Sequence, residues 1–238
     1  MGKTEHALNF QCELHALADS GRAEISRRFF KTGPGEYGAG DRFLGLRVPQ
    51  VRSLARQHKT LPMETLRECL QSPWHEERLL ALFILVEQYR RGTETSREAI
   101  YQTYLASTDR INNWDLVDSS AEHIVGAHID PDKLDILERL AVSSSLWERR
   151  IAILATFHWI KKGNFSPTVQ ISKLLLHDSH DLIHKAVGWM LREVGKRNLP
   201  CEEDFLAEHY KTMPRTMLRY ALERFPESRR QDYLHGKV

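Results

Sequence analysis

The chain has 238 residues, of which 41% are hydrophobic and 28% charged, and its formal net charge is +2. This composition indicates a folded globular protein with a sizeable core, and it excludes a disordered chain. The N-terminus is polar where a signal peptide would be apolar, and no apolar run approaches the length that spans a membrane. We therefore expect a cytoplasmic protein, folded as one domain over residues 1–238.

The apolar residues recur at steps of three and four along almost the whole chain, which predicts helices and no sheet. Proline or serine at several helix starts supports this interpretation. The expected helices are Leu8–Leu17, Arg22–Phe29, Pro49–Gln57, Pro62–Leu70, His75–Arg90, Ser96–Ala106, Trp114–Ala127, Pro131–Ala141, Trp147–Lys161, Pro167–His177, Leu182–Lys196, Glu202–Tyr210, Pro214–Arg224 and Pro226–Leu234.

The helices form a repeat. Arg78, Asp115, Arg150, Lys185 and Arg219 occupy similar places in their helices and follow one another at steps of 37, 35, 35 and 34 residues. A period of this size, with two helices in each unit, is typical of an α-solenoid of HEAT-like repeats. The sequence therefore predicts an all-α protein in which stacked helical pairs share one continuous core.

The glycine-rich segment Gly33–Gly40 interrupts this pattern. It resembles a phosphate-binding loop only superficially, because no strand precedes it and no Gly-Lys-Ser/Thr follows. A flexible connection is the favoured interpretation, and a loop that contacts nucleic acid is the alternative.

Positive charge is unevenly distributed. Residues 145–198 contain nine Lys and Arg against four Asp and Glu, an excess that suits a phosphate backbone, although many such excesses are only solvated surfaces. In the helix 182–196, Lys185, Trp189, Arg192 and Lys196 share the side opposite the apolar residues. A tryptophan among three cations suits nucleic acid, while the alternative is a neighbouring helix that covers the indole.

Two further helices carry candidates for chemistry. Trp114 and Asp118 lie one helical turn apart, although spacing alone favours an acid on the helix surface or in its N-terminal turn at both Asp118 and Asp115, and Asp115 fits this alternative better. Arg150 lies in a helix that is apolar on most sides, so we expect its guanidinium to be confined and directed at a phosphate or at one of those carboxylates.

No cofactor or metal is expected. The three cysteines, Cys12, Cys69 and Cys201, predict neither a disulfide framework nor a zinc site. The histidines and aspartates of residues 177–184 fall at a connection between helices, where turn and cap roles suit them better than metal binding.

Four segments resemble the AlkD family of DNA alkylation repair glycosylases. They are WDLVD at 114–118, WERRIAIL at 147–154, KAVGWMLRE at 185–193 and FLGLRVP at 43–49. The third is especially specific, and the resemblance covers nearly the whole chain. It implies HEAT-like repeats that curl around duplex DNA with a concave basic face. The segment Gly33–Gly40 is longer than the family pattern leads us to expect.

The resemblance also implies a function. Members of this family remove N3- and N7-alkylated purines, and the best known do so without flipping the base. By position, Asp118 matches the catalytic carboxylate, Trp114 and Trp189 match the aromatic pair at the lesion's deoxyribose, and Arg150 matches the arginine on the DNA backbone. Lys185, Arg192 and Lys196 are expected to bind the backbone as well.

The expected protein is thus a monofunctional DNA-alkylpurine N-glycosylase of base-excision repair, without a Schiff-base lysine. Its partner would be duplex DNA, bound by a monomer that is cytoplasmic and associated with the nucleoid. Two alternatives remain open: a HEAT-repeat protein that binds damaged or branched DNA without catalysis, and a scaffold for protein interactions.

Overall fold

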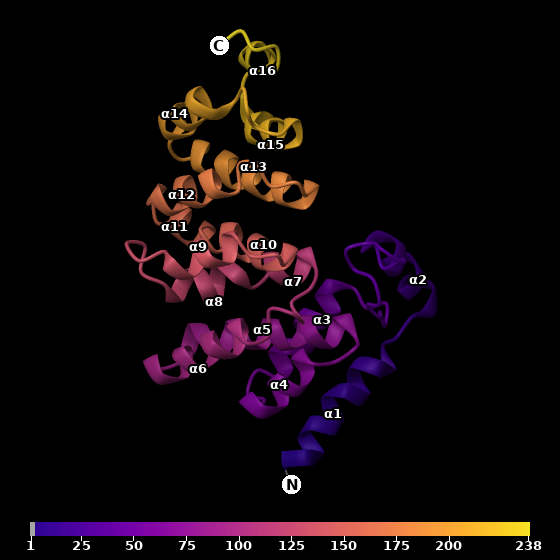
Figure 1. Cartoon of the computed structure of the whole chain (residues 1–238). Coiled ribbons are helices and arrows are strands. Elements are labelled where there is room, and N and C mark those ends of the chain that lie inside the picture. The colour runs from indigo at the N-terminus through magenta and orange to yellow at the C-terminus, as the bar shows by residue number, and fades with distance from the viewer. Residues whose placement is uncertain (1–2) are drawn as a thin grey trace. The chain divides into compact units, whose positions relative to one another are not determined.

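The described part of the chain is built from helices. The computed structural model describes the backbone of residues 3–238 and the side chains of residues 10–238. The elements are α1 (Lys3–Ala16), α2 (Ser20–Phe29), α3 (Val48–Gln57), α4 (Met63–Leu70), α5 (His75–Arg91), α6 (Glu94–Leu105), α7 (Trp114–Asp118), α8 (Ala121–His128), α9 (Asp135–Ala141), α10 (Leu146–Ala155), α11 (Phe157–Lys161), α12 (Ser166–Leu174), α13 (Asp181–Gly195), α14 (Leu199–His209), α15 (Arg215–Ala221), the 3-10 helix η1 (Leu222–Arg224) and α16 (Glu227–Leu234). Within the described backbone, β-type pairing is limited to an isolated bridge between Arg42 and Trp74. The prediction of an all-α protein is confirmed (Figure 1).

The chain divides into two compact units, residues 1–124 and 125–238. In the first unit, α5 packs against α3, α4, α6 and α7, and α1 packs against α3 (Figure 1). Leucines and isoleucines fill α5 on nearly every side, and most of its side chains are buried. Helix α5 is therefore the core of this unit. The expectation of one domain over 1–238 stays a prediction.

In the second unit, α13 has the central place, in contact with α10, α12, α14 and α15 (Figure 1). Its buried side includes Val187, Met190, Leu191 and Val194, none of which is exposed to solvent. These are the residues that the helical periodicity assigns to the core, so the orientation of this helix is as predicted. The stacking of all helices into a HEAT-like solenoid stays a prediction.

The prediction of one continuous helix over Trp114–Ala127 is wrong, because the structure interrupts it between α7 and α8. The Ser120 hydroxyl donates a hydrogen bond to the Leu116 carbonyl oxygen at 2.5 Å and is also hydrogen-bonded to Tyr104 at 3.0 Å. A serine that bonds the preceding turn competes with the regular backbone ladder and favours a bend. Asp118 is consequently the last residue of a short helix.

The helix expected over Trp147–Lys161 is interrupted in a similar way, at Thr156 between α10 and α11. The Thr156 hydroxyl donates to the Ile153 carbonyl oxygen at 2.7 Å and accepts a hydrogen bond from Thr168 at 3.0 Å. Both threonines are fully buried, so tertiary packing holds the break in place.

The helix expected from Pro131 begins only at Asp135. The Asp130 carboxylate accepts a hydrogen bond from the Asp132 amide and closes a turn that includes Pro131. Two other expected helices end early, at Leu174 and at Ala221, the second of them continuing as η1. The remaining helices lie where they are predicted, with ends shifted by a few residues.

Helices α13 and α15 approach each other closely at Gly188. A Cβ atom at this position would lie 2.4 Å from the Met217 carbonyl oxygen and 2.5 Å from the Tyr220 Cβ. We expect Gly188→Ala to lower the free energy of unfolding by about 1–3 kcal/mol, because the backbone of α15 would have to shift. Urea unfolding measures this. Gly21→Ala, in α2, is the control, because the added Cβ would lie 3.4 Å from its nearest neighbour, the Asp19 Oδ1. Equal losses of stability in the two variants would contradict the packing argument.

Candidate nucleic-acid interface

Helix α7 carries Trp114 and Asp118 one turn apart. It begins after Asn113, whose side-chain oxygen accepts a hydrogen bond from the Trp114 amide at 2.9 Å. The Trp114 indole is half-buried, stacked on Phe30 with ring centroids 5.3 Å apart, and it meets the edge of Phe29 at 5.7 Å. Phe29 itself is 61% exposed. The indole is thus held in one orientation by aromatic residues at the end of α2.

A buried network of charged groups fixes the start of α7. The His75 Nδ1 is 2.9 Å from an Asp41 carboxylate oxygen, and its Nε2 is 2.8 Å from Asp115. Arg78 forms an ion pair with Asp41 at 2.5 Å and donates a hydrogen bond to Asn112 at 3.0 Å. Asp115 therefore has a structural role at the first turn of α7, as spacing alone favours.

The loop that precedes Asp41 is made of consecutive turns. The Glu36 carboxylate accepts a hydrogen bond from the Gly33 amide at 2.8 Å, and the Gly38 amide donates to the Lys31 carbonyl oxygen at 2.9 Å. A Cβ at Gly38 would lie 2.5 Å from the Phe30 carbonyl oxygen, which explains the glycine. The segment 33–40 thereby positions Asp41, a role that is not predicted by the interpretation of this segment as a connection.

The network makes stability depend on pH through His75. Burial opposes its charge, but Asp115 and Asp41 together raise the pKa of His75 from 6.5 to about 9. The raised pKa means that the stabilisation is complete below about pH 6.5 and is lost as pH rises through about 9. We expect the free energy of unfolding to fall by about 2–3 kcal/mol over this range, measured by urea unfolding. His75→Gln should remove most of this loss. His177→Gln, in an exposed turn, should retain it, and a wild-type profile that is flat in this range would refute the assignment.

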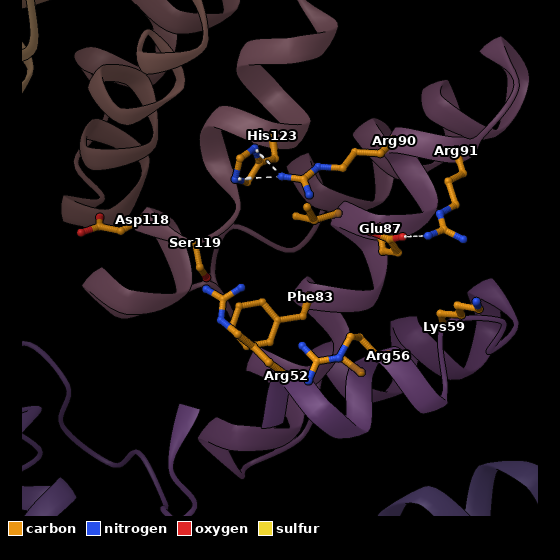
Figure 2. Close-up of a pocket in the computed structure, with 12 residues that line it drawn as sticks. Arg52, Arg56, Lys59, Phe83, Glu87, Arg90, Arg91, Asp118, Ser119 and His123 are labelled. Atoms are coloured by element: carbon orange, nitrogen blue, oxygen red, sulfur yellow. Dashed lines mark hydrogen bonds and ion pairs between the residues drawn. The ribbon is translucent and has the colours of Figure 1, made fainter. Parts of the chain in front are cut away.

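Asp118 lies half-exposed at the edge of a cleft in the first unit, formed by α3, α5 and the segment from α7 into α8 (Figure 2). The cleft has a volume of about 430 Å³. Its charged lining comprises Arg52, Arg56, Lys59, Arg90 and Arg91 against Glu87 and Asp118. In Figure 2 the Asp118 carboxylate is directed away from the guanidinium groups.

The cations of this cleft are not among the site residues predicted from the sequence. They come from α3 with the turn that follows it and from the end of α5, which are about thirty residues apart in the sequence. The spacing of Arg52 and Arg56 on one side of an amphipathic helix was the available signal, because Val51, Leu54 and Ala55 occupy the other side.

The remaining predicted site residues lie in the second unit. Arg150 is only 5% exposed and donates a hydrogen bond to the Leu182 carbonyl oxygen at 2.6 Å, so its predicted confinement is confirmed. Trp189 is half-buried, donates from Nε1 to Glu193 at 3.3 Å and meets the edge of Phe157 at 5.9 Å. Both side chains are held by neighbours within their own unit.

The three cations around Trp189 each pair with a carboxylate. The pairs are Lys185 with Asp181 at 2.7 Å, Lys196 with Glu193 at 2.6 Å, and Arg192 with Glu223. Two of these acids lie three or four residues from their cation on the same helix, a spacing visible in the sequence, whereas Glu223 belongs to η1. The positive charge on this side of α13 is therefore partly neutralised.

The histidine-rich connection at 177–184 supports the start of α13. The Asp178 side chain accepts a hydrogen bond from the His180 amide and pairs with Arg149 at 2.6 Å, while His180 accepts from the Leu182 amide. Nowhere in the described residues do three or more His, Cys, Asp or Glu side chains lie in an arrangement suited to a metal ion. Among the helices of the described residues, none combines the length and the hydrophobicity that a membrane span requires.

A family model described as "DNA alkylation repair enzyme" matches residues 10–225. The chain belongs to the DNA alkylation repair enzyme family. The resemblance seen in the sequence is thereby confirmed, and a DNA substrate follows from the family's name.

Solved structures with a similar fold include the following two. One is described as a predicted DNA alkylation repair enzyme from Enterococcus faecalis, with a TM-score of 0.67 and 18% identity, over 88% of this chain and 97% of that one. The other is smu.31 from Streptococcus mutans UA159, with a TM-score of 0.54 and 15% identity, over 92% and 96% of the two chains. At these identities the likeness concerns the fold alone. No curated protein matches the chain.

Proposed function

We propose that this member of the DNA alkylation repair enzyme family is a monofunctional glycosylase. It hydrolyses the N-glycosidic bond of cationic N3- and N7-alkylated purines in duplex DNA, as a cytoplasmic monomer without base flipping. The main support for this proposal is that the family model matches residues 10–225 of the chain. In the proposal the helices stack as HEAT-like repeats and present a concave basic face to the duplex.

Asp118 is the proposed catalytic residue. An alkylated purine is already cationic and leaves readily, so the enzyme has to stabilise the oxocarbenium-like sugar and position a water molecule. A carboxylate near C1′ can do both. The half-exposed position of Asp118 at the end of α7 suits this role, because the group is reachable yet partly shielded from solvent.

Trp114 and Trp189 are proposed to flank the deoxyribose. An indole face contributes on the order of 1–2 kcal/mol to a desolvated cation, provided that the ring is already oriented. The contacts of Trp114 with Phe30 and of Trp189 with Phe157 supply such orientation in each unit. Arg150, confined by its bond to the Leu182 carbonyl oxygen, is proposed to hold a backbone phosphate.

Lys185, Arg192 and Lys196 are proposed to contact phosphates as well. Each would have to share or exchange its present carboxylate partner, which reduces the free energy that each contact contributes.

The test is release of free base from duplex DNA that contains 7-methylguanine, with the integrity of the strand followed in the same samples. Base release without strand cleavage is the expected result. Wild-type protein that binds the duplex but releases no base would favour a non-catalytic DNA-binding protein. Wild-type protein that does not bind DNA would favour a scaffold for protein interactions.

A further inference from the structure

The cleft of the first unit is rich in cations with few acidic partners. Within the described residues, no carboxylate lies within salt-bridge distance of Arg52, Arg56 or Lys59. Arg91 pairs with Glu87 at 2.5 Å, and Arg90 lies against the His123 ring (Figure 2). This differs from α13, where the three cations around Trp189 all have acidic partners.

The cations of α3 are placed for a ligand outside the protein. Val51, Leu54 and Ala55 bury one side of α3, which leaves Arg52 and Arg56 exposed one turn apart on the other. Like charges at this spacing repel each other and destabilise an isolated helix. An external anion would remove this repulsion.

Arg52 is also held in place. Its guanidinium carbon lies 4.1 Å from the centroid of the Phe83 ring, and Phe83 is itself buried in α5 (Figure 2). A guanidinium resting on an aromatic ring retains its donors for an anion, and less entropy is lost when the anion binds. The contact with Phe83 therefore orients the Arg52 guanidinium within the cleft.

We propose that this cleft binds the sugar–phosphate backbone of DNA, and that Arg52, Arg56 and Lys59 contribute more to DNA affinity than Lys185, Arg192 and Lys196. The inference rests on the proposed function. Since the cleft and Asp118 belong to the same compact unit, a phosphate bound there has a defined position relative to the carboxylate. The cleft thus sets the register of the duplex at Asp118 from within the first unit.

The test compares three variants that each lose three positive charges: Arg52→Gln/Arg56→Gln/Lys59→Gln, Lys185→Gln/Arg192→Gln/Lys196→Gln, and the control Lys133→Gln/Lys173→Gln/Lys211→Gln. The control residues are exposed, lie in the second unit and do not line the cleft. Binding to an unmodified duplex is followed by fluorescence anisotropy at several salt concentrations. Each lost phosphate contact lowers the slope of log affinity against log salt by about 0.9.

The cleft variant should lose about 2–3 units of this slope and at least about tenfold in affinity, more than the α13 variant, while the control stays near wild type. Circular dichroism verifies that the cleft variant is folded. A slope equal to that of the control, or a larger loss in the α13 variant, overturns the inference. A cleft variant that binds DNA normally but is no longer stabilised by inorganic phosphate in thermal unfolding also overturns it, because the site would then serve free phosphate.

Failure of the proposed function has a different signature. If the wild type binds DNA without releasing base, catalysis fails, but a reduced slope in the cleft variant still supports the cleft as the backbone site.

Discussion

Asp118→Asn should reduce base release from a 7-methylguanine duplex by about 10²- to 10³-fold, because the substitution removes the negative charge that stabilises the sugar cation. DNA binding should persist, because the substitution preserves the shape of the side chain. Single-turnover release of free base measures the chemical step, and anisotropy with the same duplex measures binding.

The structure makes this variant easy to interpret. Asp118 is the last residue of α7, and a negative charge at a helix C-terminus is unfavourable to the helix dipole, so removing this charge should not weaken α7. Urea unfolding of the variant verifies its stability. Asp109→Asn is the matched control, an exposed aspartate in the same unit. Base release that is unchanged in Asp118→Asn, or reduced to the same extent in the control, would remove Asp118 from the mechanism.

Arg78→Met should lower the free energy of unfolding by about 3–5 kcal/mol, the largest loss of stability that we expect from a single substitution. Both Arg78 and Asp41 are almost fully buried, and the substitution leaves the Asp41 carboxylate without the nearer of its two cationic partners. The Asn112 side-chain oxygen loses this donor as well, and the Ser72 carbonyl oxygen keeps only its hydrogen bond from Arg110. Urea unfolding measures the change.

Arg67→Met is the matched control for Arg78→Met. Its ion pair with Glu64 is on the surface, at 3.5 Å, and such pairs contribute no more than about 1 kcal/mol. Adding Asp41→Asn to Arg78→Met should recover part of the loss, because the unpaired charge disappears. If the two single arginine variants lose similar stability, or if Asp41→Asn brings no recovery, the buried network does not hold the unit together as argued.

The interface also depends on this network. His75 joins the segment at Asp41 to Asp115, the second residue of α7, and so fixes the helix that carries Trp114 and Asp118. A loss of base release in a variant of the network can therefore be compared with the loss in Asp118→Asn only after the folded fraction of that variant has been measured.

Most of the helices, and the side that each one buries, could be predicted from the sequence. Burial in a helix follows a period of 3.6 residues, which is a local property, so the inward side of α13 with Val187 and Leu191 could be predicted from the order of residues alone. The family could be predicted for a similar reason, because its motifs at 114–118, 147–154 and 185–193 are continuous segments.

The groups that the ends of long side chains contact depend on the tertiary fold. Arg192 pairs with Glu223 from another element, and the cleft combines Arg52 of α3 with Phe83 of α5. The break at Thr156 likewise depends on a bond to Thr168 in α12. Electrostatic and hydrogen-bond partners are set by distance in space, which the local period of a helix does not encode. For this reason the pairing of Arg192 with Glu223 and the unpaired cations of the cleft could not be predicted from the sequence, whereas the local pairs of Lys185 and Lys196 could.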